Sequence, residues 1–147
     1  MNPSKHSRES EETRLKTRDL NSAKATITHA ADKLEYVKSQ ELIPATASFL
    51  FEEVYEVMKE CVRGLMAVDG HTPHTDEEIV AFLEDHYLSY YGELLIRSFE
   101  QYTGIKNDIV SRGVSASVDQ VTGAIEIAEE FLRVTQDIFE AKRAILV

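Results

Sequence analysis

The stretch ATASFLFEEVYEVMKECVRGLMAVDG, residues 45–70, decides the fold class of this chain. Its apolar side chains recur at helical spacing and form two adjacent stripes. The first stripe contains Ala47, Leu50, Val54, Met58, Cys61 and Leu65, and the second contains Phe51, Tyr55, Val62 and Met66. A helix with so broad an apolar surface needs neighbours on two sides, so we predict that it lies at the centre of a helical bundle.

Proline and glycine mark the two ends of this central helix. Pro44 suits a first helical turn, and Gly70 suits the left-handed residue that often follows a helix. Upstream, residues 11–39 are predicted to form one long helix with a narrow apolar seam. The seam is made of Leu20, Ala23, Ile27, Ala30, Leu34 and Val37. The polar residues 1–10 are expected to form a loose arm, and residues 11–147 a single domain.

Three further helices are expected after residue 70. Thr75 with Glu78, and Ser117 with Gln120, each have the spacing of a capping box at a helix start. A short helix should follow the first box, and another should begin near Ser89. The last helix has a stripe made of Val121, Ala124, Ala128, Phe131, Thr135 and Ile138. Strand-like alternation is absent, so the predicted fold class is all-α, an up-and-down bundle of about five helices.

The composition is typical of a soluble globular protein. The 147 residues suit one domain, with 43% hydrophobic and 29% charged residues. A formal net charge of −10 disfavours bulk nucleic acid, so any RNA contact must use a local cluster of cations. The single cysteine, Cys61, excludes a disulfide framework and is expected to be buried. No run is apolar enough to span a membrane and residues 1–10 do not resemble a signal peptide, so we predict a cytoplasmic protein.

Two groups of residues could suggest a metal site. One face of the central helix carries Glu52, Glu56 and Glu60. A di-iron bundle would also need inward Glu-x-x-His pairs, which the sequence lacks, so a solvated acidic face is expected instead. His71 and His74 share a loop with Asp76, but a closed zinc site needs four ligands. We therefore predict surface or capping roles for the loop residues, with no metal and no cofactor.

The stretch GIKNDIVSRG, residues 104–113, places polar groups at the end of an apolar helix. If residues 88–113 form one helix, its apolar side contains Leu88, Leu95, Phe99, Tyr102, Ile109 and Val110. Lys106 falls in the middle of that side. A lysine there must extend to solvent, pair with a carboxylate or line a cavity. Alternatively, Thr103 and Gly104 break the helical register and Lys106 points to water.

The polar residues around Lys106 form a candidate binding edge. Asn107 and Ser111 lie four residues apart and share the adjoining helix face. Arg97 is nearly aligned with Ser111 along the helix, and Arg112 follows Ser111 directly. Such an edge suits an anionic ligand or a partner subunit. The apolar stripe beside it, if incompletely covered, predicts a homodimer joined through this helix.

The order and spacing of these segments resemble the HEPN family. Its members are small α-helical bundles, often dimeric, in prokaryotic toxin–antitoxin pairs, CRISPR effectors and antiviral systems. Residues 47–70 and the stretch HTPHTDEEIVAFLEDHY after them are similar to the family's second helix, its Gly-terminated turn and its His-containing loop. Residues 102–134 are similar to its signature region, where Arg-Asn, three residues and His precede a final helix. The resemblance covers most of the chain and implies a HEPN-like bundle.

The active members of that family are metal-independent ribonucleases whose arginine and histidine pair across the dimer. Carried over position by position, the arginine falls on Lys106, the asparagine on Asn107 and the histidine on Ser111, so the Arg-x4-His motif is degenerate. Lysine lacks the bidentate fork that grips a phosphate. Serine has no proton to exchange near neutral pH, so the catalytic step is in doubt.

Three functions follow as hypotheses. The resemblance implies a non-catalytic dimeric subunit that binds a nucleotide, RNA or a partner nucleotidyltransferase, in a system of the toxin–antitoxin type. The alternative is a ribonuclease with a displaced active site, in which Arg97 with Tyr102, or Arg112, replaces the missing groups. The third is a structural subunit without a ligand. The candidate ligand-binding residues are Arg97, Tyr102, Lys106, Asn107, Ser111 and Arg112.

Overall fold

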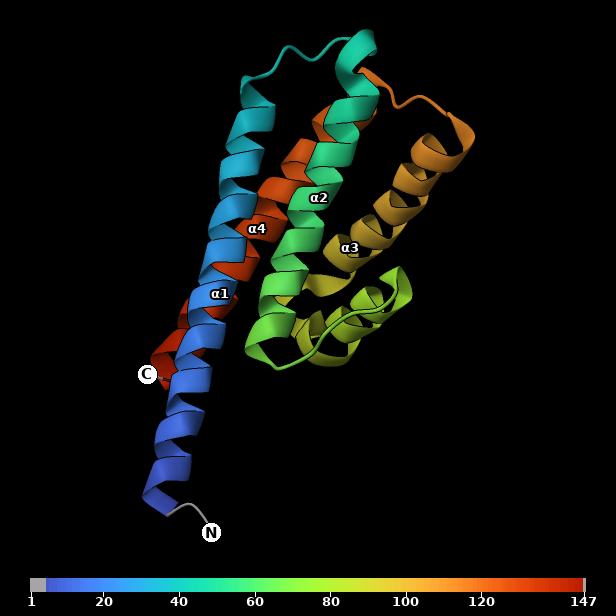
Figure 1. The fold of residues 1–147 in the computed structure, drawn as a ribbon. Helices are drawn as coiled ribbons and strands as arrows, with labels where there is room; N and C mark the ends of the chain where they lie inside the picture. The colour runs from blue at the N-terminus through green and yellow to red at the C-terminus, as the bar shows by residue number, and fades with distance from the viewer. Residues whose placement is uncertain (1–4, 147) are drawn as a thin grey trace.

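Four α-helices and no strand make up residues 5–146, the part that the computed structural model describes, with side chains described from residue 19 to residue 145. The helices are α1 (Lys5–Ser39), α2 (Pro44–Val68), α3 (Asp76–Arg112) and α4 (Val118–Leu146). Figure 1 shows α2 and α4 running in the same direction and α1 running opposite to both, with a sharply bent α3 beside them. The predicted all-α class is therefore confirmed.

The expected count of about five helices is wrong, because residues 76–112 form one bent element. No loop separates two helices near Ser89. The backbone leaves helical geometry inside α3 at Gly92, with φ 81° and ψ 162°, and the chain changes direction there (Figure 1). We call residues 76–91 the first arm of α3 and residues 93–112 its second arm. A single glycine thus takes the place of the connection that the prediction assumed.

The boundary of the first helix also differs from the prediction. Helix α1 begins at Lys5 rather than near Glu11, so residues 5–10 are helical. Residues 1–4 of the predicted arm lie outside the described residues.

The core is centred on α2, as its sequence predicts. Every member of both α2 stripes is buried, and so is every member of the α1 seam and of the α4 stripe. Helices α1 and α2 approach closely at Gly64, where an added Cβ would lie 2.8 Å from Cγ1 of Ile27. The buried Thr135 hydroxyl donates to the Phe131 carbonyl at 2.8 Å and accepts from Tyr91 at 2.6 Å, so its polar group is satisfied.

Two helix starts follow their predicted caps, one of them only in part. The amide of Gln120 donates to the Ser117 hydroxyl, and the Gln120 side chain accepts from the Ser117 amide, which completes the capping box of α4. At α3, the Thr75 hydroxyl accepts from the Glu78 amide at 3.2 Å. The Glu78 carboxylate reaches the amide of His74 instead of Thr75, at 2.7 Å. The second half of that box is therefore shifted by one residue.

The acidic face of α2 is less solvated than predicted. Glu60 is 15% exposed and lies between α1 and α2, where its Oε2 is 2.8 Å from Nδ1 of His29. Its other oxygen is 3.6 Å from the ammonium of Lys33. The prediction of a solvated side chain is wrong at Glu60, because the imidazole of His29 and the ammonium of Lys33, both on α1, face its carboxylate.

Candidate functional site

The six candidate binding residues all lie on the second arm of α3, but they do not form one cluster. This arm stays helical through Thr103 and Gly104, where the Thr103 hydroxyl donates to the Phe99 carbonyl at 3.1 Å. Gly113 ends it in the left-handed conformation, with φ 67°. The alternative in which Thr103 and Gly104 break the helical register is therefore wrong.

Lys106 reaches back to the central helix rather than into solvent. Its ammonium lies 5.8 Å from the ring centroid of Tyr55, and the side chain is half-buried. This distance fits a cation–π contact. The Tyr55 hydroxyl donates to Thr103 at 3.1 Å, and burial raises the pKa of Tyr55 to about 12. Lys106 thus lies over the ring of a core tyrosine and is half-buried there.

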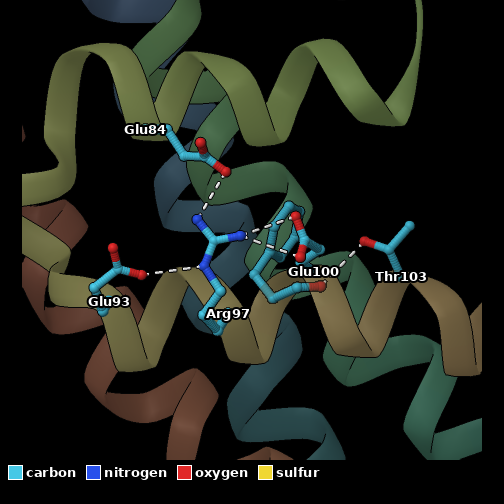
Figure 2. A network of polar contacts seen from close by, with 6 residues as sticks. Glu84, Glu93, Arg97, Glu100 and Thr103 are labelled. Carbon is cyan, nitrogen blue, oxygen red and sulfur yellow. Dashed lines mark hydrogen bonds and ion pairs between the residues drawn. The ribbon is translucent and has the colours of Figure 1, made fainter.

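Arg97 is enclosed by carboxylates, as Figure 2 shows. Its Nη2 lies 2.8 Å from Glu84 of the first arm, and its Nε lies 3.2 Å from Glu93. Its Nη1 lies 3.1 Å from both oxygens of Glu100. Hydrogen bonds to Glu84 and Glu93 raise the pKa of the guanidinium above its ordinary value. These three carboxylates neutralise Arg97, so it does not join Lys106 in an anion site.

Tyr102 also takes a structural position. Its ring packs edge-on against Phe51, with centroids 5.4 Å apart, and burial raises the pKa of its hydroxyl. This contact joins the second arm of α3 to α2. The two residues named for a displaced ribonuclease site, Arg97 and Tyr102, therefore each have partners within the chain.

The remaining candidates form an exposed end of α3. Asn107, Ser111 and Arg112 are all exposed. The guanidinium of Arg112 is 73% exposed and lies 3.4 Å from the carboxylate of Asp108, a long contact for a charged hydrogen bond. Asn107 and Ser111 share a face at a spacing of four residues. We call Lys106, Asn107, Ser111 and Arg112 the α3 edge.

The apolar stripe of α3 is broken by the bend. Leu95 and Phe99 are buried, and Tyr102 and Ile109 are half-buried. Leu88 and Val110, predicted on the same side, are 39% and 58% exposed. The change of direction at Gly92 removes Leu88 from the register of the second arm, so a single helical stripe does not exist.

A feature that the sequence reasoning missed is a cavity in the bend of α3. It measures about 320 Å³ and lies between the two arms. Its lining is made of Asp76, Glu77, Val80, Ala81, Glu84, Glu100 and Thr103. The glycine at position 92, inside an otherwise helical pattern, was the one signal in the sequence that could have indicated the bend.

The loop before α3 shows how its candidate metal ligands are used. The carboxylate of Asp76 lies 3.2 Å from the ammonium of Lys59, and the ring of His71 packs against Phe82 at 5.3 Å. In the described part of the chain, no three His, Cys, Asp or Glu side chains gather in a group able to hold a metal ion. Nor is any helix among residues 5–146 apolar over a length sufficient to cross a membrane.

Comparison with family models, curated proteins and solved structures gives no match to this chain.

Proposed function

We propose that this chain is a non-catalytic, dimeric subunit of the HEPN type that binds a nucleotide or RNA at the α3 edge. One observation carries the non-catalytic part. The position that would hold the catalytic histidine is an exposed serine, Ser111. Of the two alternative arginines on the arm, Arg97 is also enclosed by three carboxylates.

The ribonuclease alternative lacks a proton shuttle beside the α3 edge. The described histidines lie elsewhere in the chain: His29 on α1, His71 and His74 in the loop before α3, and His86 on the first arm. A serine hydroxyl cannot exchange a proton near neutral pH. Losing an acid–base partner lowers a rate by about 10²–10⁴-fold.

The charge distribution supports weak binding of an anion. The chain has a formal net charge of −10, whereas the last two turns of α3 carry two cations, Lys106 and Arg112, and one acid, Asp108. Lys106 supplies a point charge held at the Tyr55 ring, and Arg112 supplies a largely exposed guanidinium. Asn107 and Ser111 add neutral hydrogen-bonding groups beside them. With so few phosphate contacts, we expect micromolar or weaker binding that falls as salt rises.

The dimer proposal rests on exposed apolar side chains along α3. Leu94 is 73% exposed and Val110 is 58% exposed, both on the second arm. Positions 94 and 110 lie about 160° apart around the helix at about 100° per residue, so a two-fold contact between copies of this arm would cover one of these side chains. Two-fold contacts are the commonest closed arrangement. Sedimentation at micromolar concentration should give twice the chain mass of 16.6 kDa. A monomer at that concentration would contradict the dimer.

Paired assays of cleavage and binding test the proposed function. Metal-free cleavage of RNA should stay at background, and the double variant Ser111→His with Lys106→Arg should raise it. Titration with a nucleotide or a short RNA at low salt should weaken when Lys106 and Arg112 are both changed to Ala. Arg133→Ala is the matched control, because Arg133 is an exposed arginine of α4 bonded to Glu130 and Asp137.

The outcomes distinguish the three functions. Robust cleavage by the unmodified protein would favour the ribonuclease with a displaced site. An absence of binding at low salt would leave the structural subunit. A protein that binds neither nucleotide nor RNA, but forms a complex with a nucleotidyltransferase that depends on the α3 edge, would make the partner protein the occupant of that edge.

A further inference from the structure

The bend of α3 depends on the backbone of one residue. Gly92 has φ 81° and ψ 162°, a region that residues with a Cβ rarely adopt. Nothing lies within 4 Å of the position that a Cβ would occupy, so space does not select glycine there. The positive φ selects glycine at this position. Helix continues on both sides, which concentrates the change of direction in a single hinge residue.

One ion pair crosses this hinge. In the described part of the chain, the 2.8 Å contact between Arg97 and Glu84 is the only side-chain hydrogen bond or ion pair that joins the two arms. Glu93 and Glu100 lie on the same arm as Arg97, three or four residues from it, and hold its guanidinium from two sides. This arrangement directs the remaining edge of the guanidinium toward Glu84, as Figure 2 shows.

The cavity in the bend is shared by the two arms. Its first-arm lining includes Val80, Ala81 and Glu84, and its second-arm lining is Glu100 and Thr103. No side chain fills the volume of about 320 Å³ between them. A change in the angle at Gly92 would therefore change this cavity, and it would also shift the buried side chains on both sides of the bend, Tyr91 and Leu95 among them.

We propose that Arg97 is a latch across a hinge at Gly92, so that the Arg97–Glu84 contact, together with the buried side chains on both sides of the bend, holds the angle between the two arms of α3. The angle decides both the size of the cavity and the direction of the second arm. That arm carries the exposed Leu94 and the residues from Lys106 to Arg112, so the latch controls how this surface is presented. The conformational proposal stands whether or not that surface binds a ligand.

Distances between spin labels on the two arms test the latch. Labels at Asp85→Cys and Val110→Cys report on the angle, because both positions are exposed. Cys61 is fully buried and should not react, which the otherwise unmodified protein checks. Dilution with unlabelled protein removes distances between copies. The doubly labelled protein without further changes should give one narrow distance distribution.

Neutral variants of two glutamates separate the latch from general surface charge. Glu84→Gln breaks the contact between arms and should broaden the distribution, raising the open fraction about two- to fivefold, as expected for an exposed ion pair. Glu93→Gln removes a contact within the second arm and should leave the distribution unchanged. Added salt should broaden the unmodified protein's distribution and have little effect on Glu84→Gln. Equal distributions for Glu84→Gln and the unmodified protein would overturn the latch.

A charge exchange keeps the proposal testable if a single variant is unstable. Arg97→Glu alone should open the hinge, and Arg97→Glu with Glu84→Arg should restore the narrow distribution. Gly92→Ala should change the mean distance, because alanine disfavours the hinge angle. Gly104→Ala, in regular helix with open space at Cβ, is its matched control. Failure of the charge exchange to restore the distribution, with circular dichroism showing a folded helical protein, would also overturn the latch.

Discussion

Helix α2 and the second arm of α3 contain similar apolar residue types, yet the structure uses them differently. Twelve residues of α2 are buried, from Ala47 to Met66 along almost its whole length. On the second arm, the buried residues are Leu95, Ile96 and Phe99, all within two turns of the bend. Beyond them the arm has only half-buried contacts. Stability is therefore concentrated in α2, while the outer part of α3 is available for binding.

The comparison predicts very different costs for the same substitution in the two regions. Leu65→Ala should lower the free energy of unfolding by about 2–5 kcal/mol, because Leu65 is fully buried among packed neighbours. Leu94→Ala, at a side chain that is 73% exposed, should change it by less than about 0.5 kcal/mol. Chemical denaturation measures both. Equal costs would mean that α2 is not the centre of the core.

Alanine substitutions at two glycines, one on α2 and one on the second arm of α3, extend this comparison of stability between the two regions. Gly64→Ala should cost about 1–3 kcal/mol, because the new methyl group would meet the Ile27 side chain where α1 and α2 touch. Gly104→Ala meets nothing within 4 Å and should stabilise the protein by about 0.4–1 kcal/mol, since alanine favours helix and restricts the unfolded chain. Thermal and chemical unfolding of the two variants should shift in opposite directions. A gain in stability for Gly64→Ala would show that α1 and α2 can move apart.

Alkaline pH should lower the free energy of unfolding, because two buried groups of α2, Tyr55 and Cys61, lose their protons there. Burial raises the pKa of Tyr55 and of the Cys61 thiol to about 12 each, so the folded state holds these protons more tightly than the unfolded state. That contribution is complete below the unfolded pKa of about 10 for tyrosine and is lost as pH rises toward about 12. The loss should be on the order of 2 kcal/mol for Tyr55. Tyr55→Phe, which cannot ionise, should lose less stability between neutral and alkaline pH than the unmodified protein; an identical loss would contradict this assignment.

The smallest effect is expected where the second arm touches α2. Lys106→Ala removes the ammonium from the face of Tyr55 and should cost about 0.5–1 kcal/mol. Arg112→Ala, at a side chain 73% exposed, should cost less than about 0.5 kcal/mol. Chemical denaturation of both variants in parallel measures the difference. A larger cost for Arg112→Ala would mean that the end of α3 contributes to the fold and not only to its surface.

The candidate site was less predictable than the core, and the residues show why. The pattern correctly indicated that Lys106 lies beside apolar side chains, but its partner Tyr55 comes from α2. Arg97 and Tyr102 were expected to be available for a ligand, whereas Arg97 is enclosed by carboxylates and Tyr102 packs on Phe51. Helical spacing predicts which face of its own helix a side chain occupies. The spacing does not predict which other helix that side chain will contact.

The sequence by itself determined the all-α class, the buried faces of α1, α2 and α4, and the residues that cap α3 and α4. These features follow from contacts within a few residues along the chain, such as the 3.6-residue period of the α2 stripes and the reciprocal cap of Ser117 with Gln120. Only the tertiary structure decided that α3 bends at Gly92, and that the bend brings Glu84 to Arg97 across the cavity. These contacts join side chains from separate arms or helices, so they form only once the packing around α2 has fixed where each element lies.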